Sequence, residues 1–173
     1  MKIDKSSIEL AELIQRSMLL GLNLGCNLHI KYSDIGEVKG ITLGKVDYKE
    51  LGVIEGDILK IYVPDGTTEI GANAFGYDPM ILNYTMLKVY LPDTCTVIRG
   101  HAFDVYMRPI KVYGKNVLYL DDYAFCNVQK DSVLNFPSLL KTMISKKAFY
   151  CKISLDIYLN LFDFSGKLED IIK

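Results

Sequence analysis

The chain has 173 residues, a formal net charge of −1 and a hydrophobic fraction of 50%. A chain of this length can bury one sizeable core and falls within the size range of a single domain. Its near-neutral charge argues against a broad electrostatic surface for nucleic acid or for an anionic membrane.

The N-terminal segment predicts an amphipathic helix. Ser6 and Glu9 have the spacing of a capping box, and Gly21 or Gly25 would end the helix. Apolar residues at helical spacing are expected to form its buried face: Ile8, Ala11, Leu13, Ile14, Met18 and Leu22. The segment lacks the pattern of a secretory signal peptide, and its most apolar run is shorter than the roughly 20 residues that span a bilayer. We therefore expect a soluble protein that is not exported by the signal-peptide route.

The next segment, 27–44, alternates apolar and polar residues around a turn at 34–37, which predicts a β-hairpin. The stretch at 45–57 has the character of a degenerate repeat. Together with the helix, these residues are expected to form a cap over 1–57 that is continuous with the rest of a single domain.

Ala-Phe pairs that begin at residues 74, 102, 124 and 148 mark a repeat. The first two pairs follow Pro64 and Pro92, and each proline follows an alternating segment, LKIYV at 59–63 or LKVYL at 87–91. Such alternation predicts strands whose apolar side chains point into a core, and proline ends a strand. The third unit has Gly114 in place of the proline, the fourth keeps Pro137, and LDIYL at 155–159 reads as a fifth strand.

These units resemble the BspA-type leucine-rich repeat family, whose unit reads L-x-x-I-x-I-P, then V-x-x-I-G, then A-F-x-x-C. EIGANAF at 69–75 is close to that pattern, and the stretches at 124–126 and 148–151 carry its cysteine roughly in place. The resemblance extends from about residue 58 to 160. It implies an α/β, β-rich repeat fold: a leucine-rich-repeat solenoid with a parallel sheet over 58–173, capped by the N-terminal helix and hairpin and by a short turn and helix at the C-terminus.

The resemblance also implies a non-enzymatic protein that adheres to a protein partner, since members of the family are often long surface proteins. Without an export signal, a cytoplasmic protein or one encoded by a phage or mobile element is expected instead.

Strand alternation predicts two outward columns on the parallel sheet, with equivalent residues of successive coils about 4.8 Å apart. One column is expected to contain Lys60, Lys88, Lys111, Val133 and Asp156, and the other Tyr62, Tyr90, Tyr113, Asn135 and Tyr158. Tyrosine is enriched in protein interfaces, and neighbouring lysines favour an acidic partner surface.

An insertion at 76–86 lengthens the first repeat and contains Tyr77 and Tyr84, so we expect it to bulge out as a recognition loop. The lysine and tyrosine columns and this loop are the predicted protein-binding site.

Three alternatives remain open. The columns could serve only to stabilise the sheet, because stacked tyrosines on adjacent strands are favourable without any partner. The protein could be a structural subunit of a homo-oligomer or of a virion. Binding of single-stranded nucleic acid is less favoured, because the columns contain no arginine.

Catalytic and metal-binding patterns are not evident in the sequence. The cysteines Cys26, Cys95, Cys126 and Cys151 form no C-x-x-C pair and are expected to be reduced. Neither His29 nor His101 has a cysteine or carboxylate at metal-ligand spacing, so a Cys-His pair would require residues distant in the sequence to meet by folding. The sequence therefore predicts no catalytic residue, no cofactor and no metal ligand.

Overall fold

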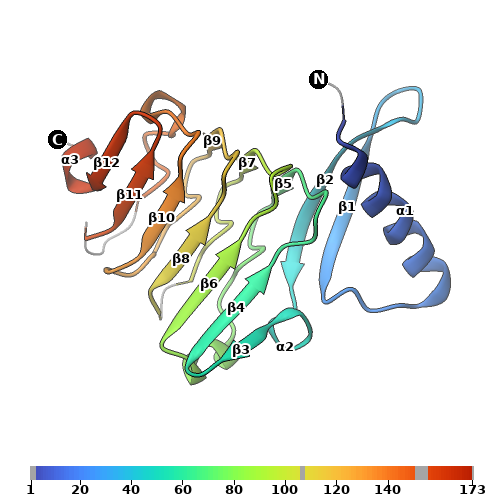
Figure 1. Cartoon of the computed structure of the whole chain (residues 1–173), viewed down its shortest axis with the longest axis horizontal. Coiled ribbons are helices and arrows are strands. Elements are labelled where there is room, and N and C mark those ends of the chain that lie inside the picture. The colour runs from blue at the N-terminus through green and yellow to red at the C-terminus, as the bar shows by residue number, and fades with distance from the viewer. Residues whose placement is uncertain (1–2, 106–107, 151–155, 173) are drawn as a thin grey trace.

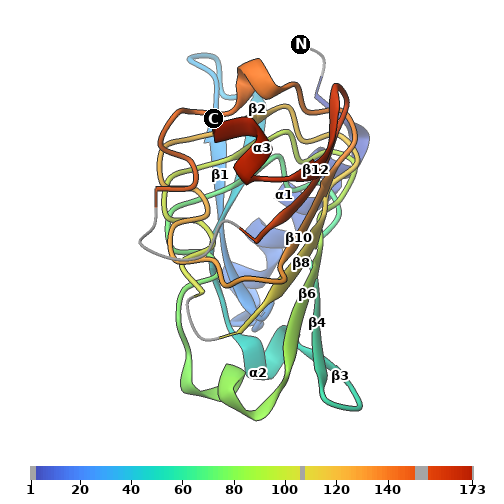
Figure 2. The same cartoon turned by 90° about the vertical axis from the view of Figure 1, so that its left-hand side faces the viewer.

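The computed structural model describes residues 3–105, 108–150 and 156–172. Through these residues the chain winds into a β-solenoid, with an N-terminal helix at one end and a short C-terminal helix at the other (Figure 1). The repeat architecture predicted from the Ala-Phe pairs is confirmed. Three successive coils each contribute one strand to a large sheet and one to a small sheet, and the next coil joins the small sheet through a single bridge between Leu120 and Ile144. The view in Figure 2 shows the coils stacked one behind another.

The larger sheet contains seven strands among the described residues, in the order β12-β11-β10-β8-β6-β4-β3. Its inner strands pair in parallel, as predicted, and an antiparallel strand lies at each edge. Pro64 and Pro92 lie just beyond β4 and β6 and end them. The strands are β3 (Val53–Glu55), β4 (Ile58–Tyr62), β6 (Met86–Tyr90), β8 (Ile110–Tyr113), β10 (Val133–Phe136), β11 (Tyr158–Leu161) and β12 (Phe164–Lys167).

The smaller sheet has the order β1-β2-β5-β7-β9 in the described part of the chain. The predicted N-terminal hairpin is confirmed by the antiparallel pairing of its first two strands. The second of these also pairs in parallel with β5, so the hairpin is joined directly to the coils. The strands are β1 (Cys26–Tyr32), β2 (Val38–Val46), β5 (Glu69–Ile70), β7 (Val97–Ile98) and β9 (Tyr119–Leu120).

The predicted N-terminal helix is α1 (Lys5–Leu20), and Gly21 ends it in the left-handed conformation. Its predicted capping box is wrong: the N-cap is Asp4, whose carboxylate accepts a hydrogen bond from the Ser6 amide. No helix in the described residues combines the length and the hydrophobicity that a membrane crossing requires.

The buried face of α1 also differs from the prediction. The buried stripe includes two serines, and Ser7 donates a hydrogen bond to the Gly66 carbonyl at 2.7 Å. These small polar residues let the helix approach the coils closely. A prediction of the buried face from hydrophobicity alone misses them. Of the predicted face, Ala11 and Ile14 are buried, and four residues are exposed: Ile8, Leu13, Met18 and Leu22. The buried stripe consists of Ser7, Leu10, Ala11, Ile14 and Ser17.

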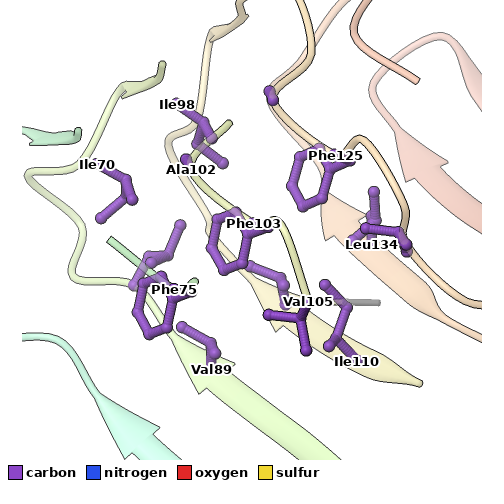
Figure 3. Close-up of a cluster of buried hydrophobic side chains, with 14 of the residues drawn as sticks. Ile70, Phe75, Val89, Ile98, Ala102, Phe103, Val105, Ile110, Phe125 and Leu134 are labelled. Carbon is purple, nitrogen blue, oxygen red and sulfur yellow. The ribbon is translucent and has the colours of Figure 1, made fainter. Parts of the chain in front are cut away.

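A column of stacked phenylalanines runs through the core (Figure 3). The ring centroids of Phe75 and Phe103 are 4.7 Å apart, and those of Phe103 and Phe125 are 4.9 Å apart. Each ring belongs to a different coil, so the Ala-Phe pairs predicted from the repeat lie in register. The alanines before them are also fully buried, which lets the backbone approach the core.

The glycine of the third unit does not take the position of the proline. Leu91 donates its amide proton to the Tyr113 carbonyl, and Gly114 donates in the same way to Asn135, so Gly114 is equivalent to Leu91. An added Cβ at Gly114 would lie only 2.5 Å from Cγ2 of Val117. Glycine therefore fits this core position because the side chains around it already fill the space.

The insertion at 76–86 is an ordered loop that contains the short 3-10 helix η1 (Pro79–Asn83). Asp78 caps this helix through the Met80 amide, and Ile81 is buried in the core. The loop packs beside the short helix α2 (Tyr48–Leu51). It is held in place by core packing as well as by its own turns.

At the C-terminal end, the strand β12 is an element that the sequence did not suggest. The predicted terminal helix is confirmed as α3 (Glu169–Ile172), and η2 (Lys141–Met143) lies in the preceding coil. The predicted turn before α3 is instead the hairpin of β11 and β12.

Candidate functional site

The predicted tyrosine column is present at its first three positions. Tyr62, Tyr90 and Tyr113 are directly paired on β4, β6 and β8. Their rings stack nearly in parallel, with centroids 4.8 Å apart for the first pair and 5.1 Å apart for the second. Tyr62 is half exposed, and the other two rings are partly buried by their neighbours. Burial raises the pKa of Tyr113, and so does the adjacent Tyr90, so this phenol is neutral at physiological pH.

Beyond the rings, the same row continues with two amides. Asn135 pairs with Tyr113, and Asn160 pairs with Asn135, whose side-chain oxygen accepts a 2.7 Å hydrogen bond from it. This row therefore offers aromatic faces over three strands and hydrogen-bonding groups over the next two.

The lysine column lies beside the tyrosines. Lys60, Lys88 and Lys111 are directly paired on successive strands. Lys60 forms an ion pair with Glu55 on β3, which lowers the pKa of Glu55 and raises that of Lys60. One end of the column is thus neutralised within the molecule. No carboxylate of the described residues lies within ion-pairing distance of Lys88 or Lys111. These two ammonium groups therefore supply most of the positive charge of the lysine column.

The predicted fifth member of each column is wrong. Tyr158 pairs with Val133 and continues the lysine column, whereas Asn160 continues the tyrosine column. The strand is shifted by two residues from the predicted LDIYL alignment, so Asp156 precedes it. A shift of two leaves every side chain on the same face, so the alternating pattern cannot reveal it. The Tyr158 hydroxyl lies 2.6 Å from the Ser165 hydroxyl on β12.

The insertion loop does not join the tyrosine column. Tyr84 lies two residues before β6 begins, whereas Tyr90 is the last residue of that strand. Five residues of strand, about 3.3 Å each, separate the two ends. Tyr77 is exposed and Tyr84 packs partly against the core, so the loop forms a separate surface.

The cysteines agree in part with the sequence prediction. Cys26 and Cys95 are thiols, and burial raises the pKa of Cys26 to about 11 and that of Cys95 to about 12. Both are therefore protonated and poorly nucleophilic at neutral pH. Cys151 lies outside the described residues.

Three potential ligands that the sequence analysis did not connect lie together on another side of the solenoid. His101 Nδ1 is 3.3 Å from Cys126 Sγ, and Asp104 completes a group whose donor atoms all lie within 4.8 Å of one another. The repeat contains a signal for part of this group, because Asp104 and Cys126 each follow the Phe of an Ala-Phe pair. Equivalent positions of adjacent coils meet in a solenoid, so the alignment could have predicted that contact.

Comparison with protein-family models, with curated proteins and with solved structures finds no match to this chain. The large sheet presents a strip of three stacked tyrosine rings, bordered by the ammonium groups of Lys88 and Lys111.

The outer face of the small sheet carries a separate ionic cluster around Glu69. Its carboxylate accepts hydrogen bonds from Lys31 at 2.7 Å, Thr42 at 3.0 Å and Arg99 at 3.1 Å. Burial raises the pKa of Glu69, but these hydrogen bonds outweigh burial, and the pKa lies below its ordinary value.

Replacing this carboxylate with an amide should make stability less dependent on pH. We expect Glu69→Gln to lower the free energy of unfolding by about 1–3 kcal/mol at pH 7. A depressed folded-state pKa contributes stability above the ordinary glutamate pKa of about 4.3, and this contribution is lost as the pH falls through the folded-state value. Urea denaturation of both proteins between pH 3 and 7 should therefore show curves that converge in acid, and a constant difference would contradict this role.

Proposed function

We propose that the protein is a non-catalytic binding module that holds another protein on the tyrosine and lysine columns of its large sheet. The observation that carries this proposal is the in-register stack of Tyr62, Tyr90 and Tyr113. Three rings held by strand pairing lose little conformational freedom on binding, which favours affinity. The resemblance to BspA-type leucine-rich repeat proteins, which are often adhesive, supports the same proposal.

The proposed partner presents an acidic and partly apolar surface. Carboxylates would meet Lys88 and Lys111, while side chains with apolar faces would cover the tyrosine rings. Glu55 already neutralises Lys60, so the positive charge is centred on β6 and β8 rather than at the β4 edge. Such complementarity mainly raises the association rate and selects the partner.

The experiment is affinity capture from the cells that make the protein, followed by binding measurements with the purified partner. Replacing Tyr62, Tyr90 and Tyr113 together with serine should abolish binding. The same variant should lose less than about 2 kcal/mol of stability, because each stacked pair contributes only about 0.2–1 kcal/mol.

A matched control replaces three exposed aromatic residues outside the tyrosine column, Tyr32, Tyr150 and Phe162, with serine. This control variant should still bind the partner with unchanged affinity. If both triple variants bind equally well, the proposed face is not the interface. If the tyrosine variant unfolds at the measuring temperature, the stack has a structural role that the proposal denies.

A structural subunit of a homo-oligomer is the second candidate. The last turn of α1 favours it, because Met18, Leu19 and Leu20 are strongly exposed there, and exposed apolar clusters mark association surfaces. Light scattering distinguishes the two functions: a stable homo-oligomer that Leu19→Glu dissociates supports assembly, and a monomer supports capture of a different protein.

A further inference from the structure

The group formed by His101, Asp104 and Cys126 joins two consecutive coils of the solenoid. His101 and Asp104 flank the Ala102-Phe103 pair of one coil, and Cys126 follows the equivalent pair of the next. Cys126 is buried, Asp104 is half-buried and His101 is exposed. The three side chains therefore form a cluster in which the sulfur is buried and the imidazole is exposed to solvent.

The donor set and its spacing fit a tetrahedral zinc ion. Zinc binds thiolate sulfur at about 2.3 Å and imidazole nitrogen at about 2.0–2.1 Å. Those bond lengths place sulfur and nitrogen about 3.5 Å apart in a tetrahedral site, and the observed separation of Sγ and Nδ1 is 3.3 Å. The Asp104 carboxylate lies close enough to become the third ligand after a small rotation, since the donor atoms are all within 4.8 Å of one another.

Neighbouring side chains hold the potential ligands in these positions. The Asn127 amide donates a 2.9 Å hydrogen bond to the Asp104 carboxylate. The His101 ring stacks on Tyr123, with centroids 5.2 Å apart. Both His101 and Asn127 have left-handed backbone conformations, with φ of 57° and 62°. Such outer contacts orient ligands and raise metal affinity.

From this geometry we infer that His101, Asp104 and Cys126 bind a zinc ion, with a water molecule as the fourth ligand. Binding releases the proton of the Cys126 thiol to solvent and leaves a thiolate on the metal. The exposed imidazole gives the ion a route in from solvent. The ion would link the two coils on a side of the solenoid away from the tyrosine and lysine columns, so the site is independent of the proposed protein-binding face.

The test is titration of the 173-residue chain with Co²⁺ under reducing conditions, followed by displacement with Zn²⁺. We expect one equivalent of Co²⁺ to produce a near-ultraviolet sulfur-to-cobalt charge-transfer band, which reports thiolate ligation directly. Zn²⁺ should abolish the band and raise the melting temperature, because a ligand that binds only the folded state stabilises it.

Variants of each ligand separate metal binding from folding. Cys126→Ala should abolish the band, whereas His101→Asn and Asp104→Asn should weaken Co²⁺ binding at least about tenfold. His101 is exposed, and asparagine tolerates its left-handed backbone, so His101→Asn should fold normally. The matched controls Cys95→Ala and His29→Asn should bind Co²⁺ with the same affinity as the original protein and give the same charge-transfer band.

Two results would overturn the inference. The first is the absence of a charge-transfer band in the original protein at millimolar Co²⁺, which would mean that Cys126 and His101 form a hydrogen-bonded contact only. The second is a band that persists in Cys126→Ala or disappears equally in Cys95→Ala, because the sulfur ligand would then be elsewhere.

Discussion

Replacing Phe103 with alanine should lower the free energy of unfolding by about 3–5 kcal/mol, the largest stability change that we expect from a single substitution. The ring is fully buried between Phe75 and Phe125, which stack on its two faces. Truncation removes both contacts and leaves a cavity in the middle of the core. The neighbouring rings cannot close this cavity, because strand pairing holds their coils apart.

The position of Phe103 in the array increases the consequence of its loss. Each coil of a solenoid is stabilised mainly by the coils next to it, so a defect in a central coil weakens two interfaces. Urea denaturation monitored by circular dichroism measures the change. Phe162→Ala is the control, because that ring is 71% exposed and should contribute little. If Phe103→Ala cost less than about 1 kcal/mol, the stacked column would not be a main source of stability.

The repeat could be predicted from the sequence because core packing requires the same residue types in every coil. The Ala-Phe pairs are buried and the strand segments before Pro64 and Pro92 pair in parallel, as their alternation indicated. The face of α1 could not be predicted in the same way, since Ser7 and Ser17 are buried through close approach and hydrogen bonding rather than through hydrophobicity.

The candidate site likewise contains some strand registers that the sequence predicts and one that it does not. The registers of Lys60 with Lys88 and of Tyr62 with Tyr90 follow from identical spacing within successive units, and the structure confirms both. The position of Tyr158 does not follow, because its strand has lost the proline that marks the register. A two-residue shift keeps the same residues facing inward, so hydrophobic pattern alone allowed either alignment.

The contact between His101 and Cys126 illustrates a further limit of sequence patterns. Metal-ligand motifs are recognised by short spacings along one segment, whereas 25 residues separate these two side chains. A solenoid brings such residues together because each turn returns the chain to the same side. In a repeat protein, ligands can therefore meet along columns of equivalent positions as well as along one segment of the chain.

Tyr90→Ala should weaken binding of the captured partner by about 2–4 kcal/mol, which corresponds to about a 30-fold to 1,000-fold loss of affinity. Tyr90 is the central ring, and it stacks on Tyr62 on one side and on Tyr113 on the other. Energetically dominant residues lie near the middle of an interface, where surrounding contacts exclude water. Tyr62→Ala at the end of the stack should therefore have a smaller effect.

The central position also separates binding from stability. Loss of two stacked pairs should cost the fold only about 0.4–2 kcal/mol, so Tyr90→Ala remains folded while affinity falls. Tyr90→Phe keeps the ring and should retain most of the affinity unless the hydroxyl contacts the partner. Calorimetry with the purified partner measures each variant, and Tyr32→Ala on the N-terminal hairpin is the control. If alanine at Tyr62, at Tyr90 and at Tyr113 each changed the affinity for the partner by less than twofold, the rings would stabilise the sheet without contributing to recognition.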